Sequence, residues 1–298
     1  MNIPKASATL QEIVDFYAKS PAFARLAATT QKDYDTQLAA VCSTVVEGKR
    51  LGAYRHKSIK VRHLTQAYES WLSVGVRTAN YRKSVLSVAW KHSMRHDVMT
   101  HDPVSLLETK SGQPRRVLWS RDQVQTFLST AYGDFRWRSI GLIVHMAYDW
   151  GQRVGDMRVL QWDKLDLTQC RMDLTQSKRN AEIHLPISKG LCDMLRQQKK
   201  DFGFQDYVAP RVKPRAGAYT PYDKVEIGII INEVLKEANL PMTLTAMDLR
   251  RTAVTEMMEG GADLAGIMQV TGHKEVGSVK PYMVNTFSGA SKALAARG

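Results

Sequence analysis

The chain has 298 residues, enough for about two domains of ordinary size, and its 44% hydrophobic and 24% charged residues are typical of a globular protein. Its 42 Lys and Arg exceed its 29 Asp and Glu, so the formal net charge of +13 favours a polyanionic partner, with nucleic acid as the first candidate. A basic protein that does not bind nucleic acid is the alternative that charge alone leaves open.

The cysteines and the hydropathy exclude several classes of protein. Cys42, Cys170 and Cys192 are odd in number and widely spaced, which argues against a disulfide framework or a zinc site and suits a reducing compartment. No stretch reaches the ~18 apolar residues that a membrane span needs, and the N-terminal residues lack an apolar signal core. The sequence therefore predicts a cytoplasmic protein without a membrane partner.

Residues 1–107 are predicted to form a bundle of helices only, and this is the more basic part of the chain. Residues 1–116 carry 18 Lys and Arg against 9 Asp and Glu, a net of +9, which leaves +4 for residues 117–298. A polar segment with Gly and Pro, residues 108–116, is the predicted linker. The helices are expected at residues 10–17 (with Thr9 as N-cap), 30–46, 63–74 and 79–94.

Residues 117–298 are predicted to form a second domain that is mainly helical with a small antiparallel sheet. Two strand-like runs, residues 171–175 and 182–187, flank a polar turn at residues 176–180. The expected helices cover residues 120–131, 140–148, 154–160, a segment that begins at 188, 225–238, 249–259 and 263–270. The predicted fold class is therefore mainly α with a small antiparallel β-sheet.

Two segments contain arginines that suit phosphodiester chemistry. A nucleophile that attacks a DNA phosphate builds negative charge on its oxygens, and guanidinium groups neutralise this charge because they are always charged and bind in a fork. Arg153 lies between two glycines in GQRVGD, with Asp156 within reach across a helical turn. Arg250, in DLRRTA, is expected in the first turn of a helix, where a bound phosphate would offset the unfavourable helix dipole. Taken alone, Arg153 is more typical of an ordinary surface turn.

Three further residues match the remaining needs of this chemistry, which are an acid for the leaving alkoxide and a nucleophile that can form an ester. Lys178 lies in the turn between the predicted strands, where a lysine amine can reach a DNA groove. His273 follows a helix end in TGHK, and Tyr282 lies nine residues later. Taken alone, a solvated turn lysine, a capping histidine and a packing tyrosine are the ordinary interpretations.

In this order and spacing the five residues resemble the tyrosine recombinase, or phage integrase, family. Successive gaps of 25, 72, 23 and 9 residues suit that family. The resemblance extends to residues 1–107, which look like the family's helical core-binding domain, and makes residues 117–298 the catalytic domain with a C-terminal tail. The family's three sequence boxes are matched by GQRVGDMRVLQW at residues 151–162, DLRRTA at 248–253 and TGHK at 271–274.

The resemblance implies a role for each of these residues. Tyr282 would attack the scissile phosphate, which gives a 3′-phosphotyrosyl link and a free 5′-hydroxyl. Arg153 and Arg250 would clamp the phosphate oxygens, and His273 would donate a hydrogen bond to the same phosphate. Lys178 would protonate the departing 5′-oxygen. No metal or nucleotide cofactor is implied, because the phosphotyrosyl ester conserves the energy of the broken bond.

Three positions near these residues qualify the resemblance. Asp156 would support the arginines, as the family's acidic residue does there. Met247 stands where the family usually has His, three residues before Arg250, and a thioether cannot serve as a general base. The resemblance therefore implies slower or differently assisted chemistry, with inactivity as the less favoured outcome. Trp150 replaces the family's usual small Thr, which we interpret as a packing variation.

Strand exchange requires several protomers, so the resemblance implies a homo-tetramer on double-stranded DNA with specific recombination sites. Accessory DNA-bending or directionality factors are further expected partners. The tail at residues 285–298 is expected to form a short helix that docks on a neighbouring protomer, with a frayed terminus as the alternative. We expect several basic side chains to contact DNA, with a solvated helix face as the alternative for each. These are Arg82, Lys83, Lys91, Arg179 and Arg251.

Several functions remain open within and beyond this resemblance. GQRVGD and DLRRTA favour a prophage-type integrase that integrates or excises a phage or mobile element. A Xer-type resolvase of chromosome or plasmid dimers and a type IB topoisomerase would use the same chemistry. A DNA-binding regulator derived from an inactive recombinase is a different class, which Met247 favours weakly and the five matched residues disfavour.

Overall fold

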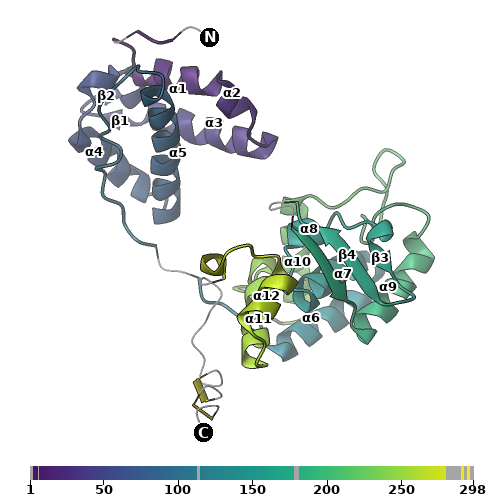
Figure 1. Ribbon diagram of the computed structural model, residues 1–298. Helices are drawn as coiled ribbons and strands as arrows, with labels where there is room; N and C mark the ends of the chain where they lie inside the picture. Colours follow the sequence, from purple (N-terminus) through teal and green to yellow (C-terminus); the bar gives the residue numbers. More distant parts are fainter. Residues whose placement is uncertain are drawn as a thin grey trace. The chain divides into compact units, whose positions relative to one another are not determined.

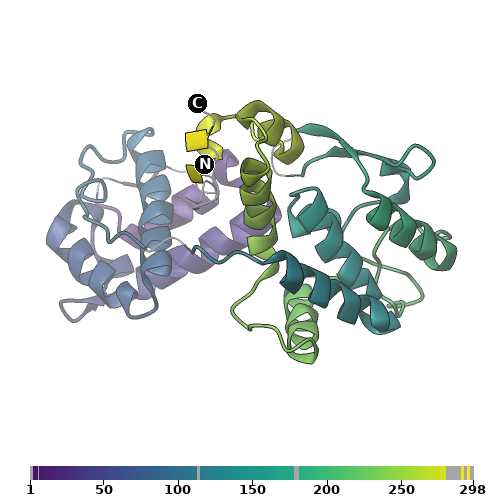
Figure 2. The same ribbon diagram turned by 90° about the horizontal axis from the view of Figure 1, so that it is seen from below.

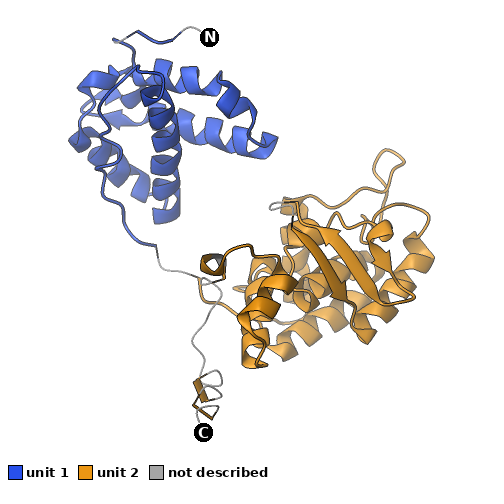
Figure 3. Cartoon of the chain, viewed as in Figure 1, with its two compact units in different colours: residues 1–114 blue, residues 115–298 orange. Residues whose placement is uncertain are grey.

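The computed structural model describes residues 3–5, 7–112, 115–177, 181–279, 290–291 and 294–295. The chain divides into two compact units, residues 1–114 and residues 115–298, which are blue and orange in Figure 3. Helices dominate both units, and the sheets among the described residues are small and antiparallel, so the predicted fold class is confirmed. In the part of the chain that the structure describes, no helix is both long and apolar enough to cross a membrane.

The first unit is built around the helix α5 (Val76–Met94), which packs against α1 (Leu10–Ala18), α3 (Ala28–Ser43) and α4 (Val61–Leu72), as Figure 1 shows. Helix α1 begins with the predicted cap, because the side chain of Thr9 accepts a hydrogen bond from the main chain of Glu12 in a capping box. The short elements of this unit are α2 (Pro21–Ala24), β1 (Val45–Val46), β2 (Lys49–Arg50), η1 (Leu51–Ala53) and η2 (His56–Ser58).

The prediction that this part of the chain is only helical is wrong at residues 45–50. Strands β1 and β2 pair antiparallel, with Val45 opposite Arg50 and Val46 opposite Lys49. Glu47 and Gly48 between them have φ angles of 49° and 76°, which are the left-handed values that a two-residue hairpin turn requires. The helix expected to reach residue 46 therefore ends at Ser43, where β-branched residues favour extended backbone.

The second unit has helix α7 (Phe135–Asp149) at its centre. It packs against α6 (Arg121–Gly133), α9 (Lys189–Phe202), α10 (Lys224–Glu237) and α11 (Ala246–Glu259), an arrangement visible in Figures 1 and 2. Eight of the fifteen residues of α7 are buried, so its apolar sequence is explained by neighbours on several sides. The remaining elements are α8 (Val154–Met157), η3 (Trp162–Lys164), β3 (Leu165–Asp166), β4 (Arg171–Thr175), β5 (Glu182–Pro186), α12 (Leu264–Thr271) and η4 (Val276–Ser278).

The sheet of this unit has three strands in the order β3–β4–β5, all antiparallel. The two predicted strands are present, with Met172 opposite Leu185 and Leu174 opposite Ile183. Burial alternates along β5, where Ile183 and Leu185 are buried while their neighbours are exposed. Strand β3 was not predicted, because a strand of only two residues has no periodicity to detect.

Residues 115–119, which we call the strap, bind the start of the second unit to the first turns of α11. Nε of Arg115 donates to both carboxylate oxygens of Asp248, at 2.8 and 3.1 Å, and Nη2 donates to Oδ2 at 2.7 Å. The main-chain N–H of Trp119 donates to the hydroxyl of Thr252 at 3.0 Å, and its indole N–H donates to the carbonyl of Thr245 at 3.0 Å. The strap therefore contacts α11 at its N-cap, Thr245, and within its first two turns, at Asp248 and Thr252.

The Asp248 carboxylate is the charged partner on which the strap depends. Burial alone would raise its pKa, but hydrogen bonds from Arg115 and Thr245 outweigh burial, so the pKa lies below its ordinary value. A lowered folded-state pKa contributes stability above the unfolded-state value of ~3.9, and this contribution is lost as the pH falls through the folded-state pKa.

The Asp248→Asn variant should therefore unfold more easily at pH 7, by about 1–3 kcal/mol, because the amide leaves the Arg115 guanidinium without its charged partner. Below about pH 4 the wild type should lose stability more steeply than the variant. Urea unfolding at several pH values measures both effects, with Asp163→Asn at an exposed Lys164 pair as the control. Parallel pH profiles of wild type and Asp248→Asn would contradict this prediction.

Candidate active site

Arg153 stands at the start of α8 and contacts the neighbouring hairpin. It is the N-cap residue of α8, and Gly151 before it has a left-handed φ of 57°, which lets the chain turn from α7 into α8. Its Nη1 donates to Oε1 of Gln176 at 3.0 Å and lies 3.8 Å from Oδ2 of Asp156. The Arg153 side chain is 26% exposed, so it remains accessible to a phosphate.

Arg250 is a buried arginine on α11 that reaches the ends of two other segments. Its Nη1 donates to the carbonyl of Gly151 at 3.0 Å, and its Nη2 donates to the carbonyl of Thr271 at 2.7 Å. The prediction that Arg250 lies in the first turn of its helix is wrong. Helix α11 begins at Ala246, because Asp248 is its third residue and completes a capping box with Thr245. Arg250 therefore lies in the second turn, away from the unfavourable end of the dipole.

His273 is buried beside Arg250, just after the C-terminus of α12. Its Nε2 lies 3.2 Å from Nη2 of Arg250, and its Nδ1 lies 2.6 Å from the hydroxyl of Thr271. That hydroxyl donates its single hydrogen to the carbonyl of Ile267 at 2.6 Å, so it must accept from Nδ1 of His273. The proton of the neutral ring is thereby assigned to Nδ1, which leaves Nε2 as the nitrogen that faces Arg250.

Asp156 connects the arginine segment to the turn between β4 and β5. This carboxylate is almost fully buried, and its Oδ1 accepts hydrogen bonds from the main-chain N–H of Ser177 at 3.3 Å and from the Ser177 hydroxyl at 2.5 Å. Ser177 is the last described residue before the turn, and Lys178 and Arg179 lie outside the described residues. The predicted nucleophile, Tyr282, also lies outside them.

Two glutamines that the sequence analysis did not single out lie within this network. Gln152 and Gln176 are both buried, and Nε2 of Gln176 donates to Oε1 of Gln152 at 2.6 Å. Gln176 also donates to the carbonyl of Thr271 at 2.9 Å, and Gln152 donates to the carbonyls of Trp150 and Val270. The only sequence signal for them was position, because Gln152 directly precedes Arg153 and Gln176 is the first residue of the predicted turn.

The two departures from the family pattern differ in their surroundings. Met247 is 73% exposed on the first turn of α11, so no packing role explains this residue. Trp150 is buried, and its indole N–H donates to the carbonyl of Pro186 at 3.1 Å. The interpretation of Trp150 as a packing residue agrees with this position.

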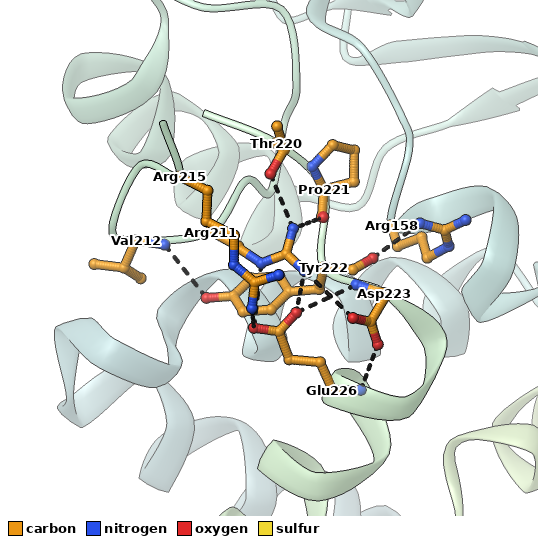
Figure 4. Close-up of polar contacts among 9 residues, drawn as sticks. All are labelled: Arg158, Arg211, Val212, Arg215, Thr220, Pro221, Tyr222, Asp223 and Glu226. Atoms are coloured by element: carbon orange, nitrogen blue, oxygen red, sulfur yellow. Dashed lines mark hydrogen bonds and ion pairs between the residues drawn. The ribbon is translucent and has the colours of Figure 1, made fainter. Parts of the chain in front are cut away.

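Another arginine of this unit, the buried Arg211, shows what a purely structural role looks like. Figure 4 shows its guanidinium between the carboxylates of Glu226 and Asp223, with further hydrogen bonds to Thr220 and Pro221. These carboxylates neutralise its charge where it lies. Arg250 donates to the main-chain carbonyls of Gly151 and Thr271, which orient its guanidinium.

The residues expected to contact DNA have different surroundings. Lys91 is exposed on α5, whereas Lys83 is half-buried and Arg82 donates through Nε to Oε1 of Gln37 at 3.4 Å. Arg251 is half-buried, and its Nη1 donates to the main-chain carbonyl of Arg115 in the strap. These positions leave the DNA-contact roles as predictions.

The structure therefore brings together four of the predicted site residues, Arg153, Asp156, Arg250 and His273, from three separate segments. Among the described residues, no group of three or more His, Cys, Asp or Glu is placed to hold a metal ion. Two cationic side chains, an imidazole and a buried carboxylate form a site suited to an oxyanion.

Comparison with known proteins decides the family. The model of the phage integrase family matches residues 119–288, which is more than half of the chain. The chain belongs to the phage integrase family. It is thus a tyrosine recombinase, as its motifs indicated, and the matched region contains each of the family's sequence boxes.

Proteins similar to this chain in sequence include two tyrosine recombinases, XerC and XerD. XerC of Bacillus pumilus is 24% identical over 230 residues, which cover 74% of this chain and 73% of the relative. XerD of Listeria innocua is 25% identical over 210 residues, which cover 64% of this chain and 66% of the relative.

Solved structures share the fold of this integrase family member at low sequence identity. A lambda integrase dimer bound to a COC′ core site has a TM-score of 0.76 at 18% identity, and the match covers 93% of this chain and 78% of that one. The Tn1549 transposon integrase in complex with a circular intermediate DNA has a TM-score of 0.75 at 16% identity. The match covers 97% of this chain and 99% of that one.

Gly272 is a position at which the site should tolerate no larger residue. It caps α12 with a left-handed φ of 67°, and an added Cβ would lie 2.8 Å from Oε1 of Gln176. The Gly272→Ala variant should therefore lose about 2–4 kcal/mol of unfolding free energy, from backbone strain and overpacking together.

Gly217 provides the matched control, because its φ is 78° but an added Cβ there would meet no atom within 4 Å. The Gly217→Ala variant should lose only about 1–2 kcal/mol, from the backbone alone. Urea denaturation of both variants measures the difference, and equal losses would show that Gln176 yields to the added methyl group.

Proposed function

We propose that this tyrosine recombinase cleaves and rejoins DNA at specific sites through a covalent 3′-phosphotyrosyl intermediate on Tyr282. The observation that carries the proposal is the convergence of Arg153, Arg250 and His273 in one hydrogen-bonded network. They are separated by up to 120 residues in the sequence, as the numbers 153 and 273 show, so only the fold brings them together. Such a cluster suits a pentacoordinate phosphate, whose oxygens carry more negative charge than those of the ground state.

In the proposed cleavage step the phenolic oxygen of Tyr282 forms a bond to phosphorus, and the bond between phosphorus and the 5′-oxygen breaks. Lys178 gives a proton to the departing 5′-oxygen, so that a free 5′-hydroxyl results. Arg153 and Arg250 hold the non-bridging oxygens. His273 donates a hydrogen bond to the same phosphate from Nε2 when both ring nitrogens carry a proton, since Nδ1 already donates to Thr271. Attack by a 5′-hydroxyl of another strand reverses these steps and rejoins the DNA.

The Tyr282 phenol loses its proton to solvent water during this attack, because the usual histidine at the Met247 position is absent. A thioether accepts protons too weakly to serve as the base. Oδ1 of the buried Asp156 carboxylate accepts hydrogen bonds from Ser177, and we assign this carboxylate a supporting role for the arginine segment in this scheme.

The proposed partner is double-stranded DNA, and the proposed assembly is a tetramer on two paired sites. The net charge of +13 supports a polyanionic partner. A lambda integrase tetramer bound to a Holliday junction, with a TM-score of 0.75 at 17% identity, supports the assembly. Accessory bending or directionality factors remain a prediction from the sequence.

The proposed biological role is integration or excision of a phage or mobile element. The structural likeness to lambda integrase and to the Tn1549 transposon integrase supports this role. The second candidate is Xer-type resolution of DNA dimers, which the sequence likeness to XerC and XerD supports.

A covalent-capture experiment tests the proposal directly. The full chain is incubated with a pool of duplexes that carry a randomised sequence and a nick, since a nick lets the short cleaved fragment diffuse away and traps the protein on DNA. Wild type should become linked to a subset of sequences, and Tyr282→Phe should give no covalent product because it lacks the attacking oxygen.

Denaturing gels followed by sequencing of the linked DNA identify the site and the product. A covalent product that persists in Tyr282→Phe would exclude this residue as the nucleophile. Sequence-specific binding by wild type without any covalent product would contradict the proposed activity and favour a DNA-binding regulator.

The Met247→His variant tests the missing proton acceptor. Because Met247 is 73% exposed, an imidazole fits there without a change in packing. Cleavage of the captured site near neutral pH should become faster, by up to about 10²-fold, if proton removal limits the rate. Met247→Gln, a polar control without a base, should show no gain, and an equal gain in both variants would argue against base catalysis.

A further inference from the structure

Gln176 is a buried, uncharged residue with partners in two segments of the candidate site, those of Arg153 and His273. We infer that Gln176 is a positioning residue for DNA cleavage: it fixes the guanidinium of Arg153 through a neutral acceptor and joins the lysine-bearing turn to the segment of His273. The inference rests on the proposed function. Its first support is that the Gln176 side chain is 0% exposed, so its hydrogen bonds are made without competition from water.

The orientation of the Gln176 amide follows from the chemistry of its partners. Arg153 can only donate, so the group 3.0 Å from its Nη1 must be the amide oxygen. The carbonyl of Thr271 can only accept, so the group 2.9 Å from it must be the amide nitrogen. The second hydrogen of that nitrogen goes to Oε1 of Gln152 at 2.6 Å. A flipped amide would place like groups against each other at every contact.

Gln152 in turn has its own orientation fixed by main-chain carbonyls. Its Nε2 donates to Trp150 at 2.8 Å and to Val270 at 2.6 Å, which leaves only its oxygen for Gln176. The two amides thus form a directed chain that ends at Arg153, in which each hydrogen bond polarises the next. A residue without the amide at position 176 would leave buried donors and acceptors unpaired along this chain.

Packing also holds the Gln176 amide in place. All three of its terminal atoms would lie within 3.0 Å of a Cβ added at Gly272, so the amide lies directly against the backbone of that glycine. Its own main-chain N–H donates to the carbonyl of Ala181 at 2.9 Å, which closes the base of the β4–β5 turn. The next residue, Ser177, is fixed to Asp156. The residues on either side of the Lys178 turn are therefore tied to the arginine network.

A neutral acceptor suits the task of orienting Arg153. The hydrogen bond to Gln176 restricts the guanidinium while leaving its positive charge available to a phosphate. A carboxylate at this short distance would hold Arg153 as tightly but would compete with the phosphate for its charge. Asp156, the nearby carboxylate, stays at the longer distance of 3.8 Å from Nη1.

The test compares single-turnover cleavage of the captured DNA site by full-length variants. Gln176→Met removes the amide at nearly constant shape, and it should slow cleavage about tenfold or more while DNA affinity stays within about twofold of wild type. The Gln176→Glu variant keeps an acceptor for Arg153 but adds a charge, and it should also be slow. A Gln176→Glu variant as fast as wild type would overturn the argument for a neutral acceptor.

Gln198 supplies the matched control for loss of a buried glutamine. It is also 0% exposed, its Oε1 accepts from Nε of Arg138 at 2.9 Å, and its Nε2 donates to Ser139 and Val208. Gln198→Met should therefore cost a similar unfolding free energy but leave cleavage unchanged. If Gln198→Met slows cleavage as much as Gln176→Met, the effect of position 176 is one of stability alone, and the inference fails.

A double-mutant cycle with Arg153→Lys separates positioning from general damage. If Gln176 acts through Arg153, then Gln176→Met should have little further effect on cleavage in the Arg153→Lys background. Independent, multiplying effects would overturn the inference while leaving the proposed function intact, since wild type cleaves in the same assay. Absence of cleavage by wild type would instead refute the proposed function, and the inference with it.

Discussion

Two carbonyl groups at the end of α12 hold the candidate site together. A helix leaves its last carbonyls without partners of its own, and here side chains from distant segments supply them. The carbonyl of Val270 accepts from Gln152, and that of Thr271 accepts from both Gln176 and Arg250. These acceptors lie at the negative end of the helix dipole, which favours a nearby guanidinium. The last carbonyl groups of α12 thus accept hydrogen bonds from the same side chains that form the candidate site.

The arginines of the second unit are held by different kinds of partner. Arg211 contacts two carboxylates and fastens the segment before α10, so its charge is neutralised within the fold. Arg153 and Arg250 donate to neutral oxygens, from an amide and from main-chain carbonyls, and Arg153 also lies 3.8 Å from the Asp156 carboxylate. Orientation by dipoles lets a site be rigid before substrate arrives while it still attracts an anion.

The sequence predicted those parts of the site whose chemistry is visible in a single residue. Arg153, Arg250 and His273 stood out because charged or titratable groups occur in short motifs in a fixed order, and the fold brings them together. Gln176 had no such signal, because an amide acquires its role only from partners 23 to 95 residues away. Long helices and their caps were predicted well, whereas the two-residue strands are too short to show a periodicity. The start of α11 was missed because its local capping box, Thr245 with Asp248, was not recognised.

The strap fixes the start of the second unit next to the candidate site. Arg115 lies near the end of the predicted linker segment, and its guanidinium is bound to Asp248, two residues before Arg250. This ion pair anchors the incoming chain to the same helix that carries Arg250. The chain therefore enters the second unit at a point fixed within one helical turn of a candidate phosphate-binding side chain.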